Sequence, residues 1–143
     1  MICYFDTSAL IPLLVEEGGS DVAGRLWDAA DHVVSSRLVY AEGRAALAQA
    51  HRTDRIDAAG LRRVVTDLEV LMGDLDLVEV GAAVVHRAGQ LAELLALRGY
   101  DAIHLGSAES LADPDLVLVA GDRQLLRAAG ELQIAVADLA ADE

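Results

Sequence analysis

The chain has 143 residues, of which 54% are hydrophobic, and this length and composition predict a folded domain with a full core and exclude a disordered chain. Acidic residues number 24 against 11 basic ones, so the net charge is −13, and every basic residue is an arginine because lysine is absent. Such totals, with only 3% aromatic residues, exclude a broad basic face and make a base-stacking platform for nucleic acid improbable.

The first half of the chain alternates between apolar runs and helical segments. Residues 2–5 form a short apolar run that predicts a buried strand, and residues 32–36 (HVVSS) carry the β-branched residues typical of a second strand. Apolar residues at helical spacing predict four helices, and Ser20 is the expected cap of the second. These helices are expected at residues 8–15, 21–30, 37–52 and 57–72.

The second half continues the same alternation. Strands are predicted at residues 75–80, 116–120 and 132–136, and helices at residues 82–97, 101–111 and 122–129. Gly99 is expected to end the helix 82–97, because glycine is favoured just beyond a helix C-terminus. Continuous apolar strands that alternate with helices indicate an α/β fold with a parallel sheet covered on both faces. In such sheets, ligands bind at the carboxyl ends of the strands.

The organisation and the location of the protein follow from what the sequence does not contain. It has no internal repeat and no linker-like segment, so residues 1–143 are expected to form a single domain. No apolar run approaches the roughly 18 residues that span a bilayer, and the N-terminus lacks the basic start of a signal peptide. We therefore expect a cytoplasmic protein without membrane contact. Cys3 has no partner cysteine and is expected to be buried as a small hydrophobe.

Three aspartates lie where predicted helices begin. Asp6 ends the first strand, Asp122 follows the strand 116–120, and Asp101 opens the helix 101–111. Each could simply cap its helix, because an aspartate there accepts hydrogen bonds from free backbone N–H groups and complements the helix dipole. Their position at strand ends also suits a binding site, and the residues alone leave both interpretations open.

Glu42 is different, because it is expected about a turn and a half inside the helix 37–52, beyond the free N–H groups. Its neighbours on the same helix face are Leu38, Val39, Ala45 and Ala46, so the carboxylate is expected in an apolar stripe. An unpaired carboxylate there would cost several kcal/mol or would take up a proton. Glu42 therefore requires a cation.

A divalent metal ion is the simplest source of that positive charge. Lysine is absent, and the nearest arginines flank the acids in sequence without being directed at them: Arg37, Arg44 and Arg123. A ligand set of carboxylates without cysteine or clustered histidine suits Mg²⁺ or Mn²⁺. The four histidines are scattered and are expected to be ordinary surface or core residues: His32, His51, His86 and His104. His104 is set apart from the others because it lies only three residues after Asp101.

Several enzyme classes can be excluded from missing motifs. The chain has no glycine-rich phosphate loop followed by lysine, no His-x-x-x-His pair of a zinc protease and no Gly-x-Ser-x-Gly nucleophile elbow. Phospho-receiver domains and haloacid-dehalogenase-like phosphatases also place acids at strand ends. The absence of lysine and the missing second aspartate in "FDTSA" argue against both.

Four stretches, taken together, carry a resemblance to a known family. They are "YFDTSAL" at the start, "SSRLVYAE" ending in Glu42, "YDAIHLGSAE" from Tyr100, and "LVLVAGDRQLL" near the end. In order and spacing, over essentially the whole chain, they resemble the PIN-domain ribonucleases, and in particular the VapC-type toxins of bacterial toxin–antitoxin pairs. The resemblance implies a three-layer α/β/α sandwich with a central, mainly parallel sheet.

The resemblance also implies a metal-dependent endoribonuclease site. Its acidic residues correspond to Asp6, Glu42, Asp101 and Asp122, with Asp6 and Asp101 as the expected direct ligands of Mg²⁺ or Mn²⁺ and the other two acting through water or a second ion. Thr7 or Ser8 would assist ligation or orient a carboxylate. The family commonly has a threonine two residues before its fourth acid, where this chain has Ala120.

The implied partners are an RNA substrate and a small antitoxin protein. Arg37, Arg44 and Arg123 are candidates for phosphate contacts. Residues 8–30 and 37–72 carry apolar side chains that could bind the antitoxin or a second copy of the chain, which gives a homodimer or a toxin–antitoxin hetero-oligomer. These side chains are Leu10, Ile11, Leu14, Trp27, Leu61 and Val65. Two alternatives stay open: a catalytically silent PIN-fold module that binds RNA or protein, and a metal-dependent nuclease that acts on DNA.

Overall fold

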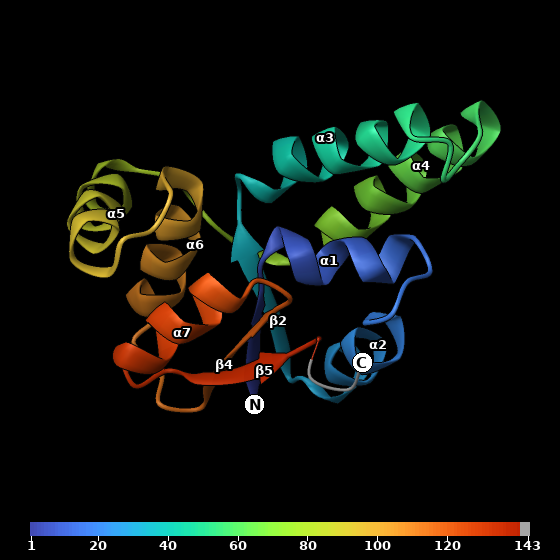
Figure 1. Cartoon of the computed structure of the whole chain (residues 1–143). Coiled ribbons are helices and arrows are strands. Elements are labelled where there is room, and N and C mark those ends of the chain that lie inside the picture. Colours follow the sequence, from blue (N-terminus) through green and yellow to red (C-terminus); the bar gives the residue numbers. More distant parts are fainter. Residues whose placement is uncertain (141–143) are drawn as a thin grey trace.

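The centre of the molecule is a parallel five-stranded sheet (Figure 1). The computed structural model describes residues 1–140. The strand order is β3-β2-β1-β4-β5, and β1 in the middle pairs with both β2 and β4. The strands have the bounds Ile2–Phe5 (β1), His32–Ser36 (β2), Asp76–Val78 (β3), Leu116–Ala120 (β4) and Ala135–Asp138 (β5).

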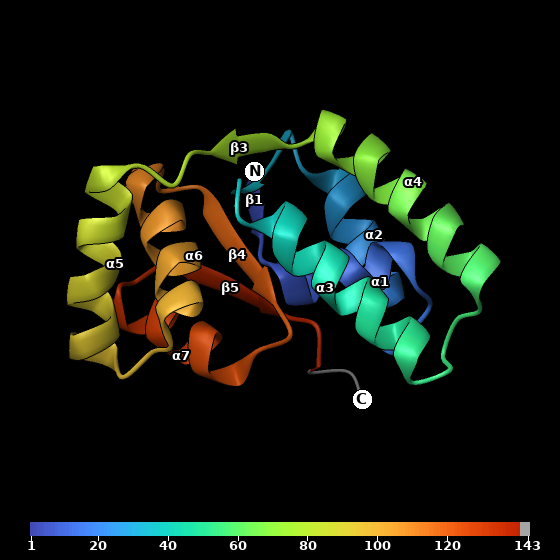
Figure 2. The same ribbon diagram turned by 90° about the horizontal axis from the view of Figure 1, so that it is seen from above.

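Helices cover both faces of the sheet, which gives the expected α/β/α sandwich. Figures 1 and 2 show α1 to α4 on one side of the sheet and α5 to α7 on the other. On the first side lie α1 (Thr7–Leu14), α2 (Ser20–Ala29), α3 (Val39–Arg52) and α4 (Ala58–Asp74). On the second side lie α5 (Ala82–Leu95), α6 (Gly99–Ser110) and α7 (Arg123–Glu131). No helix within residues 1–140 is both long and apolar enough to cross a membrane.

The central strand β1 divides the core between the two helix layers. Successive side chains of a strand point to opposite faces, so Tyr4 packs with the α5–α7 layer, whereas Cys3 and Phe5 pack with α1 and α2. All three side chains are fully buried, and the burial of Cys3 confirms the prediction for the single thiol. Because β1 is apolar on both faces, it can only be an interior strand.

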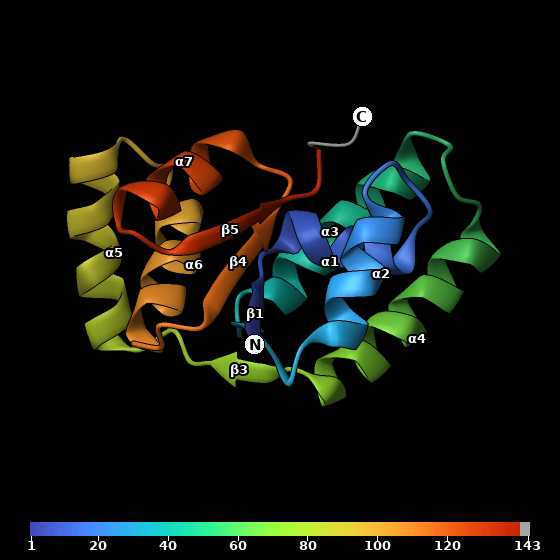
Figure 3. The ribbon, with the colours of Figure 1, turned by 90° about the horizontal axis from the view of Figure 1, so that it is seen from below.

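The helices α3 and α4 form a hairpin with a small core of its own (Figure 3). This core is built from Leu47, Val64 and Leu68, and α1 contributes to it on one side. Some of the apolar side chains expected at an interaction surface are used here instead. Leu61 and Val65 pack against this core, whereas Leu10, on α1, is buried in the core beside Phe5.

Trp27 also belongs to the core and not to an open surface. Its ring packs edge-on against Phe5 with the ring centroids 5.5 Å apart. The exposed large hydrophobic residues are other than those named as contacts, for example Val70, which lies on α4 within residues 37–72, and Leu94 on α5. The expected apolar surface over residues 8–30 and 37–72 is therefore largely internal packing.

Three local predictions were wrong. Gly99 does not end α5, which stops at Leu95 with Ala96 in the left-handed conformation (φ 56°), and Gly99 instead begins α6. Ser20 is not a cap but the first residue of α2, and its hydroxyl accepts a hydrogen bond from the Glu17 N–H. The last strand lies at Ala135–Asp138 and not at 132–136, because α7 runs on to Glu131 and a turn follows with Gln133 at φ 62°.

Candidate functional site

Asp6 lies at the point where the central strand passes into α1. The carboxylate caps α1, and its Oδ1 accepts hydrogen bonds from the Ala9 N–H at 3.1 Å and the Ser8 hydroxyl at 2.7 Å. Only 4% of the residue is exposed. The pKa of Asp6 is raised to about 6, mainly by burial and to a smaller extent by the charge of Asp122, while the hydrogen bonds from Ser8 and Ala9 and the nearby His104 oppose the rise.

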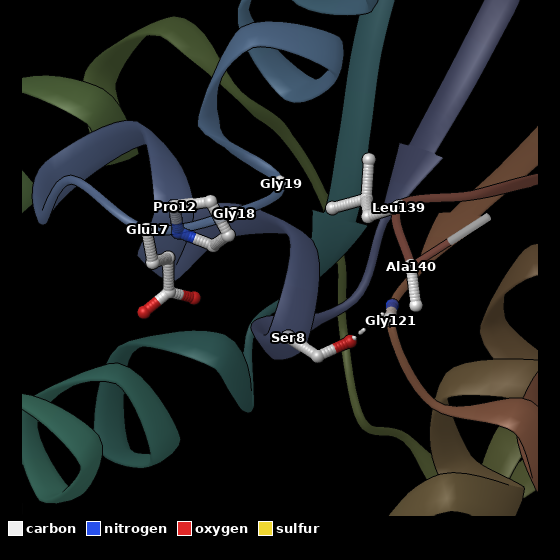
Figure 4. Close-up of a pocket in the computed structure, with 8 residues that line it drawn as sticks. All are labelled: Ser8, Pro12, Glu17, Gly18, Gly19, Gly121, Leu139 and Ala140. Atoms are coloured by element: carbon white, nitrogen blue, oxygen red, sulfur yellow. Dashed lines mark hydrogen bonds between the residues drawn. The ribbon is translucent and has the colours of Figure 1, made fainter. Parts of the chain in front are cut away.

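Asp122 lies next to Asp6 because β1 and β4 are neighbouring parallel strands with adjacent carboxyl ends. It caps α7, and its Oδ1 accepts from the N–H groups of Gln124 and Leu125. Ser8 links the turn that follows β1 to the turn that follows β4, since its hydroxyl donates to Asp6 and accepts from the Gly121 N–H at 2.8 Å. Figure 4 shows this bond beside a pocket of about 190 Å³.

Asp101 reaches the site from α6. It is 6% exposed and is the third residue of its helix, whose N-cap is Arg98, so the capping interpretation of Asp101 was wrong. Burial raises the pKa of Asp101, the hydrogen bond from Arg98 lowers it, and the charge of Asp122 adds to the rise.

Arg98 lies across these two acids. Its Nε donates to Oδ2 of Asp101 at 3.1 Å, and its Nη2 lies 3.5 Å from Oδ2 of Asp122. The guanidinium also stacks on the ring of Tyr100 at 5.2 Å from the centroid. Sequence reasoning missed this arginine. A signal existed, because a residue three positions before Asp101 shares its helix face once the helix begins at Gly99.

Glu42 lies on α3, but its expected position deep inside that helix was wrong. The helix α3 begins at Val39, so Glu42 lies in its first turn and not a turn and a half inside. Its surroundings are also less apolar than expected, because Ala45 is exposed and the Glu42 side chain itself is 22% exposed. Glu42 is distinguished by the hydrogen bonds that its carboxylate accepts from side chains of two other helices.

Two donors hold the same oxygen of Glu42. The Thr7 hydroxyl donates to Oε1 at 2.7 Å, and Nε2 of His104 lies 2.6 Å from the same atom. Burial acts to raise the pKa of Glu42, but the His104 and Thr7 bonds outweigh it and hold this pKa below its ordinary value. His104, expected to be an unremarkable core or surface residue, is 1% exposed and contacts the site directly.

The three arginines predicted as phosphate contacts are not brought to the acids. Arg37 makes a two-pronged ion pair with Glu79, and Arg44 donates to the hydroxyl of Tyr40. Arg123 is exposed at the first residue of α7, directly after Asp122. Of these three, Arg123 is therefore the best placed to meet a ligand at the carboxylates.

The carboxylates can accept a hard cation without losing their structural bonds. Within residues 1–140, the hydrogen bonds to Asp6 and Glu42 go to Oδ1 and Oε1, which leaves Oδ2 and Oε2 without a protein donor. No three metal-binding side chains in this range converge tightly enough to enclose an ion. That is compatible with Mg²⁺, which keeps several waters and usually takes one or two carboxylates directly. The donor set therefore fits a hydrated divalent ion.

A relative with a named activity is similar over most of the chain. The chain is 45% identical over 124 residues to Ribonuclease VapC45 of Mycobacterium tuberculosis (strain CDC 1551 / Oshkosh), and the match covers 87% of this chain and 86% of the relative. An identity of this level over this length relates the two proteins across nearly all of the fold described above.

Solved structures agree in fold. PAE2754 from Pyrobaculum aerophilum superposes with a TM-score of 0.71 at 24% identity, over 97% of this chain and 84% of that one. A toxin–antitoxin complex from Klebsiella pneumoniae gives a TM-score of 0.67 at 15% identity, over 96% of this chain and 97% of that one. The family model described as "PIN domain" matches residues 3–131, a range that contains all four acids. This chain belongs to the PIN-domain family.

Proposed function

We infer that this chain is a divalent-metal-dependent endoribonuclease and the toxin of a toxin–antitoxin pair. The observation that carries this is the 45% identity to a protein named as a ribonuclease over 87% of the chain, supported by Asp6 and Asp122 at the adjacent carboxyl ends of β1 and β4 and by Arg98 pairing with both Asp101 and Asp122. Two of these acids, Asp6 and Asp101, are buried with raised pKa values, which is typical of acids placed for function and not for stability.

Asp6 and Asp101 hold the metal ion, which we assign as Mg²⁺ or Mn²⁺. Glu42 and Asp122 bind its water molecules or a second ion. When bound, such an ion lowers the pKa of a coordinated water and stabilises charge on a phosphodiester. The role of Ser8 and Thr7 is to orient carboxylates, because their hydroxyls donate to Asp6 at 2.7 Å and to Glu42 at 2.7 Å.

The RNA substrate and the antitoxin bind at the same acidic edge of the sheet. The cation neutralises the carboxylates so that a phosphate can approach, and our candidates to contact that phosphate are Arg98, which pairs with Asp101 and Asp122, and Arg123, which follows Asp122 directly. A structural relative from Klebsiella pneumoniae is a toxin–antitoxin complex, which supports a small protein partner for this chain. The assembly is then a toxin–antitoxin hetero-oligomer built from residues 1–143 as one domain.

RNA cleavage with and without metal tests the function. The purified chain is incubated with a mixed RNA pool in Mg²⁺ or Mn²⁺ and in EDTA, together with Asp6→Asn, Glu42→Gln and Asp101→Asn variants. We expect cleavage by the wild type with metal only, and at least a roughly hundredfold loss in each variant.

A matched control is Asp57→Asn, because Asp57 also caps a helix, accepting from the Gly60 N–H at 2.7 Å, but lies at the start of α4. This variant should cleave like the wild type. Cleavage that resists EDTA, or full activity in the three site variants, contradicts the metal site. Metal binding without cleavage of RNA, or cleavage of DNA alone, contradicts the ribonuclease assignment.

A further inference from the structure

A chain of three buried or half-buried side chains runs from the central strand to Glu42. The Tyr4 hydroxyl lies 2.8 Å from Nδ1 of His104, and Nε2 of the same ring lies 2.6 Å from Oε1 of Glu42. Tyr4 and His104 are 0% and 1% exposed. The three residues come from β1, α6 and α3, so they connect the central strand with one helix from each layer.

We propose that His104 is a positioning residue for the nuclease site: Tyr4 fixes its ring with the proton on Nε2, and the ring fixes Glu42 so that Oε2 is presented to the metal ion. The inference rests on the proposed function, because it assigns a task to Glu42 in metal binding. It adds two residues, Tyr4 and His104, whose side chains would act without contacting either the ion or the RNA.

The direction of the hydrogen bonds follows from their chemistry. A carboxylate oxygen accepts hydrogen bonds, so the ring donates from Nε2 at its 2.6 Å contact with Oε1 of Glu42. With the proton of Nε2 directed at Glu42, Nδ1 is left for the Tyr4 hydroxyl, which lies 2.8 Å away and can donate to it.

The geometry at Glu42 explains why such support is useful. A glutamate has three rotatable bonds, and the Glu42 side chain is 22% exposed, so packing alone does not fix its carboxylate. Two donors from separate helices, Thr7 on α1 and His104 on α6, converge on Oε1. The carboxylate plane is therefore held from two sides while Oε2 stays free of protein donors within residues 1–140. Groups that orient ligands in this way commonly change metal affinity when removed.

The ring of His104 is itself held rigidly. It packs edge-on against Tyr4 with ring centroids 5.9 Å apart. Its helix neighbours Leu105 and Ala108 are fully buried in the core of the α5–α7 layer. A side chain with this degree of support can transmit a fixed orientation, whereas an exposed histidine could not.

Metal affinity is the decisive measurement, because it does not depend on turnover. The dissociation constant for Mn²⁺ is measured by electron paramagnetic resonance for the wild type, His104→Leu and His104→Gln, with circular dichroism to verify folding. His104→Leu removes the donor and should weaken Mn²⁺ binding roughly tenfold. His104→Gln keeps an N–H near the position of Nε2 and should restore affinity to within about threefold of the wild type.

The matched control is His51→Leu. His51 lies on α3, as Glu42 does, but at the opposite end of that helix. Its Nδ1 lies 3.1 Å from the carbonyl oxygen of Ile56, which follows the helix. This variant should bind Mn²⁺ like the wild type. A further control places His104→Leu in a Glu42→Gln background, where it should change the affinity by less than about twofold, because the two residues act through one contact.

The tautomer gives a second readout. Two-bond correlation spectra between the ring protons and ¹⁵N of histidine should show the His104 proton on Nε2, and Tyr4→Phe should weaken this preference and lower Mn²⁺ affinity by a few-fold. Unchanged affinity in a folded His104→Leu variant, or a ring without a proton on Nε2, overturns the proposal while the nuclease function stands. A wild type that binds no divalent ion overturns both.

Discussion

The Nε atom of Arg98 lies 3.1 Å from Oδ2 of Asp101, and this contact places a protein cation among the carboxylates that we assign to the metal. The same guanidinium reaches Asp122 at 3.5 Å. Its side chain is 61% exposed, so it can leave at little cost. We therefore expect Arg98 to compete with a metal ion for the acids in the absence of RNA and to become available to a phosphate when the ion binds.

Replacing Arg98 should strengthen metal binding. Because Arg98→Gln removes a competing charge from a mostly exposed pair, we expect the affinity for Mn²⁺ to rise roughly twofold to fivefold, and the KM for RNA to rise as well. Titration calorimetry and cleavage kinetics measure the two effects. Arg55→Gln is the control, since Arg55 pairs with Glu17 and should change neither quantity. Weaker metal binding in Arg98→Gln contradicts the competition.

The stability of the metal-free protein should depend on the protonation of Asp6. Its pKa is about 6 in the folded state and close to 4 in an unfolded chain, so the folded state binds more protons between these values. The contribution of Asp6 to the free energy of unfolding therefore rises as the pH falls from about 7 to about 4. Asp6→Asn, which preserves the cap, should be more stable than the wild type at neutral pH by on the order of 1–3 kcal/mol.

This stability difference should vanish near pH 4, where both side chains are neutral. Urea unfolding at a series of pH values in EDTA checks it. Asp57→Asn exchanges a comparable cap at an exposed position and should follow the wild-type curve throughout. A constant difference between wild type and Asp6→Asn across the pH range would contradict the role of the buried charge.

Divalent ions should stabilise the folded chain. An ion that binds only the native state at about a hundred times its dissociation constant adds about 2.7 kcal/mol, which for a chain of this size is a rise in Tm of several degrees. Differential scanning calorimetry with Mg²⁺, Mn²⁺ and EDTA measures the shift. Asp101→Asn should abolish most of it, whereas Asp76→Asn on the edge strand β3 should not.

Ser8 should matter for stability and for activity together. Its hydroxyl joins Asp6 to the Gly121 N–H, so Ser8→Ala removes two hydrogen bonds and leaves the carboxylate with less support. We expect a loss of about 1–2 kcal/mol in unfolding free energy and a clear fall in cleavage rate. Ser110→Ala, which removes a hydroxyl bonded to the Ser107 carbonyl at the end of α6, should affect the rate little.

The arginines near the site should differ in their contribution to RNA binding. Arg37 is occupied by Glu79 in a two-pronged ion pair, whereas Arg123 is exposed beside Asp122. Arg123→Gln should therefore weaken RNA binding by more than Arg37→Gln and reduce its dependence on salt. Fluorescence anisotropy with labelled RNA at several salt concentrations measures both, using Asp6→Asn protein to prevent cleavage. Equal effects of the two substitutions would contradict this ranking.

The sheet could be predicted from the sequence because its strands are continuously apolar. The strands β1, β2 and β4 lie at the residues expected, and the order of helices between them leaves only a parallel arrangement. The predicted element ends were wrong at turns where a residue adopts a backbone conformation that its residue type rarely adopts. Ala96 and Gln133 adopt left-handed conformations that favour glycine or asparagine, so neither turn is visible in the sequence.

The aspartates, the glutamate and the two hydroxyl residues after the first strand, Thr7 and Ser8, were predictable, and both hydroxyls donate to carboxylates as expected. Position after a strand indicates Asp6 and Asp122, and the structure shows that both are caps as well as members of the acidic group. Glu42 was singled out by an argument that misplaced its helix boundary. His104 could not be found, because its partners Tyr4 and Glu42 are 100 and 62 residues away in sequence, and only the fold brings them together.

The central place of β1 has a consequence for how this protein comes into being. This strand is completed by β4, whose residues pair with it across more than a hundred positions of sequence, as in the register of Ile2 with Leu116. During synthesis β1 therefore has no β4 beside it, and Asp6 has no Asp122 beside it, until the residues of β4 and the turn after it have been made. The pairing of these two acids is a late product of folding.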